Sequence, residues 1–186
     1  MELRETIDKR RALRSLKPAA ITTNLIQDLA GQASLAPSCF NNQPWRFVFV
    51  YSKEMLEKLF PALSKGNAWA QSASMIIAVI SRKDLDCQVK GRDYYQFDTG
   101  MAAGFLMLRA TELNLVCHPI AGYDEQMVKE ILTVPDNMTV ITLLIVGKIS
   151  GEISPMLNEK QAESEKSRPP RLKFEDFAFI DTYPSG

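Results

Sequence analysis

Residues 73–80 restrict the possible folds of this chain most strongly, because they are apolar at nearly every position. The run reads Ala-Ser-Met-Ile-Ile-Ala-Val-Ile, without the alternation that a strand with one wet face would show. We therefore predict a β-strand that is covered on both faces. Residues 139–147 predict another buried strand. Strands of this kind need other structure packed on each side of their sheet.

Helical and extended patterns alternate along the rest of the chain. Residues 45–51 (Trp-Arg-Phe-Val-Phe-Val-Tyr) have the composition of a strand. Helices are expected over residues 2–12, from Thr22 or Thr23 to residue 33, and over residues 53–63, 98–113 and 125–132, with Ser52, Asp98 and Asp124 as N-caps. Four strands separated by helices predict an α+β or mixed α/β sandwich.

Two segments have a character of their own. Residues 98–113 are so apolar that we expect their helix to be buried nearly all round. Residues 81–93 form a charged connection, which we expect to be the most mobile segment.

The charge balance excludes some classes of partner. Lys plus Arg and Asp plus Glu number 22 each, so no global field attracts nucleic acid or an anionic membrane. The longest strongly apolar run, residues 100–108, is too short to cross a bilayer, which needs about 20 residues. The charged N-terminus shows no secretory signal. We expect one domain of 186 residues with its own core.

Cysteine and histidine usage limits the chemistry. Cys39, Cys87 and Cys117 are odd in number and widely spaced, unlike a disulfide framework or a CxxC metal site. We therefore expect reduced thiols and a cytoplasmic protein. His118 is the only histidine, so a multi-histidine metal site is excluded, and we expect no metal.

Two polar stretches are candidates for ligand binding. Residues 36–47 place Ser, Cys, Asn and Gln side chains between two prolines and ahead of a strand, a rigid platform for a planar ligand with polar edges. The alternative is a surface loop whose amides cap nearby backbone. Arg10, Arg11 and Arg14 gather three charges within five positions, which is either a solvated helix end or an anion site. If the helix persists that far, Arg10 and Arg14 share one face.

The first polar stretch carries a resemblance. Pro37-Ser38-x-x-Asn41-x-Gln43-Pro44-Trp45 resembles the signature loop of the nitroreductase family, which consists of flavin-dependent homodimeric oxidoreductases. Residues 10–14 (Arg-Arg-Ala-Leu-Arg) resemble the family's Arg-x-Ser-x-Arg segment, which holds the FMN phosphate and ribityl chain. Ala12 replaces the usual Ser, so one hydroxyl contact should be missing.

The resemblance extends from Arg10 to about Asp176. Asp98-x-Gly100-x-Ala102 and the apolar run after it resemble the family's central helix, which is shared with the dimer interface. Asn114 stands where the family usually has Gly, a mild change because Asn also forms left-handed helix ends. Residues 166–171 resemble the basic segment that closes the phosphate site.

The resemblance implies an α+β fold, a three-layer α/β/α sandwich with a central mixed sheet, in a homodimer. Residues 1–150 would form the FMN-binding domain. Residues 151–186 would form a C-terminal arm that packs on the partner subunit, in agreement with the late apolar residues Phe174, Phe177 and Phe179.

It also implies the cofactor site. The 37–41 loop would come from one subunit and the arginines from the other, and whether Arg168 or Arg171 closes the phosphate site is left open. No residue is assigned as catalytic, because the flavin performs the chemistry. The residues implied in FMN binding are Arg10, Arg11, Arg14, Pro37, Ser38, Cys39, Asn41, Asn67, Ala121, Gly122, Arg168 and Arg171.

The function implied is an FMN-dependent oxidoreductase that uses NAD(P)H to reduce nitroaromatic, quinone or related small acceptors by a ping-pong two-electron mechanism. The sequence has no GxGxxG motif, so the nicotinamide donor would bind transiently in the substrate pocket. One alternative is a related enone reductase or reductive dehalogenase, and another is a flavin-binding module without turnover. A third is a flavin-free acyl-transfer enzyme that uses Cys39 and His118.

Overall fold

The apolar run at residues 73–80 forms the central strand β3 (Met75–Ser81), and every side chain of β3 is buried in the computed structural model, which describes residues 2–184. Strand β3 pairs with β7 (Thr139–Ile149) on one edge and with β2 (Arg46–Val50) on the other. Strand β6 (Leu115–Ile120) pairs with the far edge of β7, and the short β1 (Leu16–Lys17) pairs with its end. A two-stranded hairpin, β4 (Gln88–Val89) and β5 (Arg92–Asp93), stands apart.

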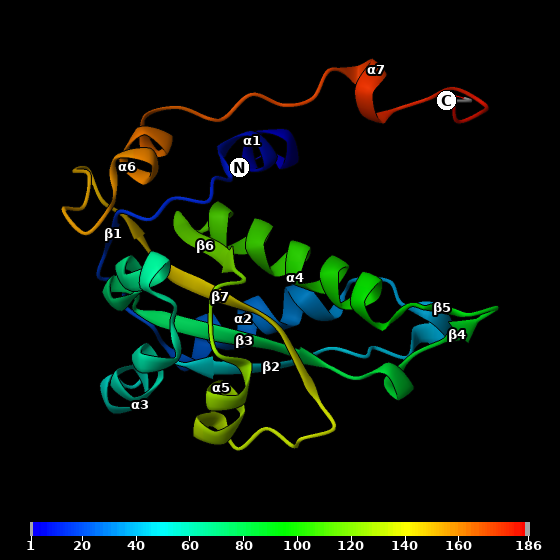
Figure 1. Ribbon diagram of the computed structural model, residues 1–186, viewed down its shortest axis with the longest axis horizontal. Coiled ribbons are helices and arrows are strands. Elements are labelled where there is room, and N and C mark those ends of the chain that lie inside the picture. The colour runs from blue at the N-terminus through cyan, green and yellow to red at the C-terminus, as the bar shows by residue number, and fades with distance from the viewer. Residues whose placement is uncertain (1, 185–186) are drawn as a thin grey trace.

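Helices cover both faces of this sheet. The helices are α1 (Leu3–Lys9), α2 (Thr23–Ser34), α3 (Lys53–Leu59), α4 (Tyr95–Glu112), α5 (Glu125–Leu132), α6 (Glu159–Lys166) and α7 (Phe174–Phe177). Short 3-10 segments lie at Cys39–Asn41, Phe60–Ala62, Lys65–Ser72 and Lys83–Leu85. Figure 1 shows α4 above the sheet and α3 and α5 below it.

The side chains on the two faces of β3 pack into two separate hydrophobic cores. Met75, Ile77 and Val79 pack with the buried side chains of α2 and α4. Ile76, Ala78 and Ile80 pack with those of α3, α5 and the 3-10 segments that follow α3. The prediction of a strand covered on both faces, within three layers, is therefore confirmed. Every strand pairing among residues 2–184 is antiparallel, which differs from the mixed sheet that we expected.

Several predicted helix ends agree with the structure. The side chains of Thr22, Ser52 and Asp124 accept hydrogen bonds from backbone amides in the first turns of α2, α3 and α5. Asn114 adopts the left-handed conformation after α4, with φ 60°.

Two helix predictions were wrong. Helix α1 ends at Lys9, so residues 10–14 are not helical and do not place two arginines on one helix face. Helix α4 begins at Tyr95, so Asp98 lies inside its first turn rather than at its N-cap.

Helix α4 is not buried all round, contrary to expectation. Its inner face (Ala102, Leu106 and Ala110) is completely buried, but Phe97 is 64% and Phe105 is 42% exposed. A cavity of about 490 Å3 opens beside Phe105, between α1 and α4. The helix reads as apolar all round because its outer face also carries apolar side chains, of which Phe97 and Phe105 are exposed while Met101, Met107 and Leu108 are half-buried.

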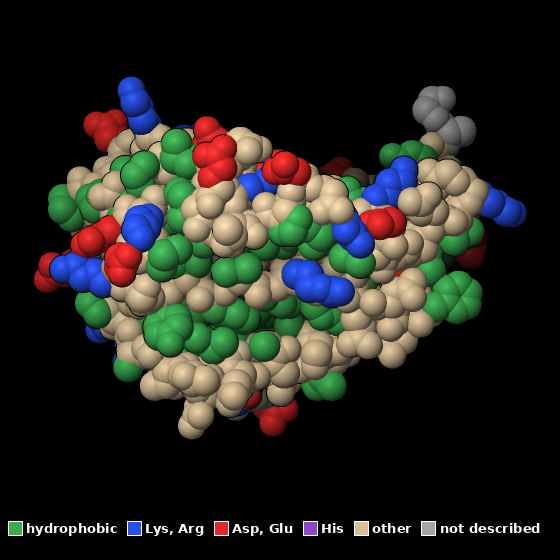
Figure 2. Space-filling view, turned by 90° about the horizontal axis from the view of Figure 1, so that it is seen from below, with side chains coloured by type: hydrophobic (Ala, Val, Ile, Leu, Met, Phe, Trp, Pro, Cys, Tyr) green, Lys and Arg blue, Asp and Glu red, His purple; other side chains and the backbone are tan. Residues whose placement is uncertain are grey.

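The C-terminal segment runs along one side of the molecule in Figure 1, past α1 and away from the sheet. Its large apolar side chains are exposed, among them Phe174, Phe177 and Ile180. Figure 2, seen from the side of α3 and α5, shows hydrophobic side chains gathered across the middle of that face. No helix within residues 2–184 has the length and apolar character needed to span a membrane.

Candidate functional site

A cavity of about 160 Å3 lies where the segment after α1 meets the chain after α6. We call it the arginine pocket. Its lining is Arg10, Arg11, Ala12, Arg14, Ser164, Arg168, Pro169 and Arg171. All five arginines among the residues implied in FMN binding therefore lie together, although they come from the two ends of the chain.

Glu165 in α6 fixes the first of these segments. Its carboxylate accepts hydrogen bonds from the backbone amides of Arg14 (2.9 Å) and Ser15 (3.0 Å). The chain after α1 is therefore held extended against α6. This carboxylate is bound to backbone amides, and none of the ion pairs between residues 2–184 joins it to an arginine.

Arg11 and Arg168 hold the pocket walls together. The Arg11 guanidinium donates to the carbonyl oxygens of Ser164 (2.8 Å), Glu165 (3.1 Å) and Ser167 (2.8 Å), which caps the end of α6. Arg168 donates to the carbonyl oxygens of Asp8 and Arg10 and so joins the C-terminal segment to the end of α1. By contrast, the only hydrogen bond of the Arg171 side chain within residues 2–184 goes to the Pro169 carbonyl, at 3.3 Å.

The pocket concentrates positive charge. The pKa of the Arg10 guanidinium is lowered, first by burial and then by the charges of Arg168 and Arg171. None of the ion pairs between residues 2–184 involves one of the five arginines. A group of guanidinium ions without a carboxylate partner is suited to a phosphate, whose oxygens accept paired hydrogen bonds.

Arg14 connects the pocket to a buried aromatic pair. Its guanidinium carbon lies 6.0 Å from the centre of the Trp69 ring, and that ring lies 4.7 Å from the His118 ring. Nδ1 of His118 is 3.0 Å from the carbonyl oxygen of Leu13. Burial lowers the pKa of His118 to about 4, so this imidazole is neutral near pH 7.

Asn67 and Gly122 form a tight contact beside this pair. The Asn67 side chain donates to the Gly122 carbonyl oxygen at 2.9 Å, and the Ser64 amide donates to the same oxygen at 3.0 Å. A Cβ on Gly122 would lie 2.4 Å from Ser64 Oγ and 2.7 Å from Asn67 Nδ2, so a larger residue here would displace both of these side chains. Ala121 precedes Gly122 and is exposed.

One 3-10 segment, Lys65–Ser72, links this contact to the arginine pocket. It carries both Asn67 and Trp69, and Gln161 of α6 donates to the carbonyl oxygen of its Gly66 at 2.8 Å. The structure therefore brings the arginines, Asn67, Ala121 and Gly122 to one end of the sheet.

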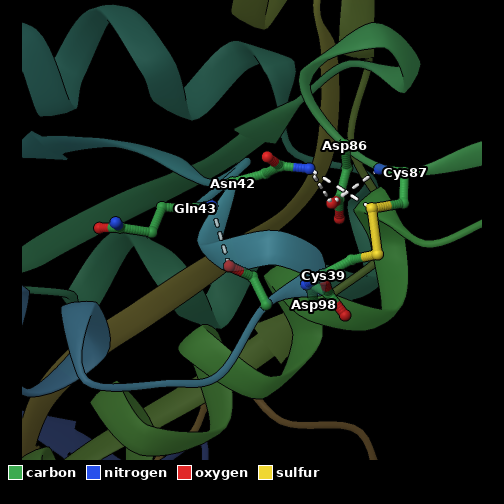
Figure 3. The surroundings of a disulfide bond; sticks show 7 residues. Cys39, Asn42, Gln43, Asp86, Cys87 and Asp98 are labelled. Atoms are coloured by element: carbon green, nitrogen blue, oxygen red, sulfur yellow. Dashed lines mark hydrogen bonds between the residues drawn. A yellow bond between two sulfur atoms is a disulfide. The ribbon is translucent and has the colours of Figure 1, made fainter.

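The loop at residues 37–43 lies elsewhere, beside the first turn of α4 and the β4–β5 hairpin (Figure 3). Cys39 is joined to Cys87 by a disulfide. The expectation of three reduced cysteines is therefore wrong, because folding brings together two residues 48 positions apart. Nothing in the sequence indicates this pairing, since neither cysteine belongs to a recognisable spacing pattern.

Polar contacts hold this loop in an unusual backbone conformation. Ser38 Oγ accepts from the Gln43 amide at 2.9 Å, and Asp98 Oδ2 accepts from the Cys39 amide at 2.7 Å (Figure 3). Phe40, Asn41 and Gln43 all have positive φ, at 48°, 58° and 49°. Such angles are disfavoured for residues other than glycine, so the contacts must hold the loop against its local preference.

Two acids lie beside the disulfide: Asp86, which sequence reasoning did not single out, and Asp98, which it predicted as a helix cap. Asp86 Oδ1 accepts from the Cys87 amide at 2.8 Å, and from the Asn42 side chain at 3.3 Å. The pKa of Asp98 is raised, mainly by burial and also by the nearby Asp86 carboxyl group. Cys39, Asp86 and Cys87 could offer three metal-ligating atoms within 4.8 Å, but the two sulfurs are bonded to each other.

The predicted cofactor residues thus fall into two groups within one chain. Pro37, Ser38, Cys39 and Asn41 lie near the hairpin, whereas the arginines lie near α6, and Figure 1 shows the hairpin and α6 at opposite ends of the molecule. The acyl-transfer reading of Cys39 and His118 is wrong, because the Cys39 sulfur is bonded to Cys87 and His118 packs against Trp69.

The sequence matches a family model described as the nitroreductase family over residues 7–72 and 65–148. A Stutzerimonas stutzeri protein named as an NADH dehydrogenase/NAD(P)H nitroreductase is 31% identical over 124 aligned positions, which span 56% of this chain and 63% of that protein. The match thus spans less than two thirds of that relative. Bacillus subtilis YdgI, named as an NAD(P)H nitroreductase, is 28% identical over 80% of this chain and 88% of its own.

The chain is also similar to a relative named for a dehalogenation reaction and to a solved structure. A protein of Haliscomenobacter hydrossis named iodotyrosine deiodinase is 27% identical over 86% of this chain and 85% of its own. A crystal structure of an oxidoreductase containing FMN has a TM-score of 0.83 and 25% identity, over 97% of this chain and 92% of that one.

Proposed function

This chain belongs to the nitroreductase family, and on that premise we propose that it is an FMN-dependent oxidoreductase that takes electrons from NAD(P)H and reduces nitroaromatic, quinone or related small acceptors. The single observation that carries this proposal is the arginine pocket. Five guanidinium groups without a carboxylate partner among residues 2–184 fit the phosphate of FMN.

In this proposal the arginines of the pocket have different roles in binding FMN. Arg10 and Arg171 are the arginines with fewest ties to the protein, so we assign them to the phosphate oxygens. Arg11 and Arg168 bind backbone carbonyls and shape the pocket. Arg14 lines the pocket on the side of Trp69, and its guanidinium lies 6.0 Å from the centre of the Trp69 ring. We assign it to the ring end of the cofactor.

Two subunits complete the site in this proposal. The 37–43 loop and the arginine pocket lie at opposite ends of one chain, so one copy cannot place both on a single FMN. A second copy would supply the loop to the first copy's arginines. The uncovered apolar face of α4, with Phe97 and Phe105 exposed, supports a homodimer because monomers rarely leave such surfaces open.

Bound FMN supplies the two-electron transfer from a nicotinamide donor to an oxidised acceptor. The protein positions the reactants and stabilises charge. His118 is buried and neutral, so we do not assign it to proton transfer, and solvent provides the protons.

The test is a visible spectrum of the purified protein, before and after anaerobic addition of NADH or NADPH. Flavin bands that bleach, and that return when a nitroaromatic or quinone is added, are expected. Bands that persist with both donors would mean a flavin-binding module without turnover. Absence of flavin bands after incubation with FMN would refute the proposal.

Reductive dehalogenation is a second candidate, favoured by the similarity to iodotyrosine deiodinase. It shares the FMN site and differs in the acceptor. Release of iodide from an iodinated phenol, at a rate well above that of nitroaromatic reduction, would select it.

A further inference from the structure

We propose that Cys39 and Cys87 form a reversible thiol–disulfide site that locks the 37–43 loop, and that its reduction by a small dithiol weakens FMN binding. The second part rests on the proposed function, whereas the first part concerns the loop alone.

The loop needs a restraint in addition to its own hydrogen bonds, such as the one from the Gln43 amide to Ser38 Oγ. Phe40 has a φ of 48° although its side chain is 90% exposed. An aromatic residue in the left-handed region is disfavoured, and an exposed ring gains no packing in compensation. The restraint must therefore come from the neighbouring residues.

The disulfide is the only covalent restraint at this point. Cys39 directly precedes Phe40, and its sulfur is bonded to Cys87 at the start of the β4–β5 hairpin. The hairpin is itself anchored, since the Tyr94 amide donates to the Cys87 carbonyl oxygen at 3.2 Å. The disulfide thus ties the strained turn to a second element.

Without the disulfide, only hydrogen bonds would hold the turn. Within the loop, the Gln43 amide donates to Ser38 Oγ at 2.9 Å, and the amides of Asn41 and Asn42 donate to the carbonyl oxygens of Ser38 and Cys39. The loop is tied to α4 by the hydrogen bond from the Cys39 amide to Asp98, at 2.7 Å, and to the segment before the hairpin by the longer one from Asn42 to Asp86, at 3.3 Å. Reduction would let Phe40, Asn41 and Gln43 relax toward negative φ. Because Ser38 and Asn41 are assigned to the cofactor, the relaxed loop would bind it less tightly.

The surroundings of the sulfurs suit thiol exchange. Both cysteines are partly exposed, so a small reductant can reach them. The Asn42 side-chain amide donates to Cys87 Sγ at 3.5 Å. That donor would stabilise a thiolate on Cys87. The Asp86 carboxylate lies within 4.8 Å of both sulfurs and opposes a thiolate on either, so the amide donor distinguishes them and makes Cys87 the preferred leaving group and Cys39 the sulfur attacked.

Reduction of the Cys39–Cys87 disulfide by a dithiol proceeds in two thiol–disulfide exchange steps. A thiolate of the dithiol attacks Cys39 Sγ, the Cys39–Cys87 bond breaks, and Cys87 leaves as a thiolate that takes a proton. The second thiol of the reductant attacks the mixed disulfide, which frees Cys39 and closes the reductant into a ring. Two electrons and two protons pass to the protein, and the dithiol becomes a disulfide.

The experiment compares the air-oxidised full-length protein with the same protein treated with dithiothreitol. Alkylation and mass spectrometry report the thiols, hydrogen exchange reports the amides of residues 39–43, and FMN titration reports the Kd. Reduction should expose two further thiols, speed exchange in the loop about tenfold and raise the Kd for FMN about tenfold. Oxidised glutathione should reverse all three changes.

Two variants serve as controls. The double variant Cys39→Ser with Cys87→Ser should match the reduced protein both with and without dithiothreitol. Cys117→Ser should respond like the natural chain, because Cys117 is buried and lies outside the pair. Circular dichroism of the double variant would show that the fold persists.

Each alternative outcome is distinct. Three free thiols in the air-oxidised protein, or a reduced protein with unchanged loop exchange, would overturn the thiol–disulfide lock. Faster loop exchange with an unchanged Kd would overturn its link to the cofactor. Faster loop exchange in a protein that binds no FMN in either state would leave the lock standing and refute the proposed function instead.

Discussion

In the proposed phosphate site, we expect binding to depend most on Arg10, because burial and the charges of Arg168 and Arg171 disfavour its charged form. An anion in the pocket would relieve that repulsion. We expect Arg10→Ala with Arg14→Ala to raise the Kd for FMN at least tenfold and to leave the fold intact, since charge-assisted hydrogen bonds contribute about 1.5–3 kcal/mol each.

The matched control for this pair is Arg4→Ala. Arg4 is exposed on α1, and its one ion pair within residues 2–184 is a surface pair with Asp8. Its removal should leave the Kd unchanged in fluorescence titrations of FMN. Equal affinity for FMN in the double variant and the natural chain would exclude the arginine pocket as the phosphate site.

A substitution at Gly122 would test the close contact between Gly122 and Asn67. An added methyl group would lie 2.4 Å from Ser64 Oγ and 2.7 Å from Asn67 Nδ2. Gly122→Ala should therefore lower the free energy of unfolding by about 1–3 kcal/mol and weaken FMN binding. Gly151→Ala is the control, because a methyl group there meets nothing within 4 Å. Urea unfolding of both variants measures the difference, and equal midpoints would contradict the packing seen here.

His118 should make stability depend on pH. Its pKa is about 4 in the folded state and near 6.5 when unfolded, so the unfolded chain binds more protons between these values. Stability is then fully present above about pH 6.5 and falls as the pH drops toward 4, by up to about 3 kcal/mol. The raised pKa of Asp98 acts in the opposite sense, so the natural chain must be compared with His118→Gln. That variant should lose less stability between pH 7 and pH 4.5 in urea unfolding, and parallel losses would contradict a buried neutral His118.

At the scale of elements, sequence periodicity located the buried strands and the main helices. Local signals such as the caps at Thr22, Ser52 and Asp124 were reliable because they act within one helical turn. The pairing of Cys39 with Cys87 could not be inferred, since it depends on how α4 and the hairpin pack against a distant loop. Asp98 was wrongly predicted as the N-cap of α4 for the same reason. Its carboxylate accepts a hydrogen bond from the Cys39 amide, which belongs to that distant loop.

The site was predictable to the extent that it matched a family motif. The five arginines came from such motifs, and the structure gathers them in one cavity. Their individual tasks were not predictable, because the contacts of Arg11 and Arg168 with backbone carbonyls depend on where α6 ends. The 3-10 segment that joins Asn67 to α6 also left no sequence signal beyond a turn.

The C-terminal arm offers a test at the element scale. Its exposed Phe174 and Phe177 have no partner surface within residues 2–184, and Arg168 and Arg171 line the pocket. We expect a chain that ends at Lys166 to dimerise more weakly and to bind FMN at least tenfold less tightly, through lost apolar burial and lost charge. Light scattering and FMN titration measure both effects. A truncated chain that stays dimeric and keeps its affinity would refute the proposed role of the arm.

At the scale of the whole molecule, two surfaces of the single chain remain open. The outer face of α4 exposes Phe97 and Phe105, and β2 lies at an edge of the sheet without a second neighbour among residues 2–184. A groove of about 300 Å3 runs beside β2, lined by strand residues and by α5. Both surfaces agree with an assembly in which two chains share their flavin sites.

Subunit complementation tests this shared site directly. One variant, Arg10→Ala with Arg14→Ala, lacks the pocket, and a second, Ser38→Ala with Asn41→Ala, lacks the loop contacts. Each alone should bind FMN poorly. When equal amounts are unfolded and refolded together, half of the dimers are mixed and each mixed dimer has one intact site, so about a quarter of all sites should regain natural affinity. A mixture that binds no more FMN than its components would contradict a site built from two chains.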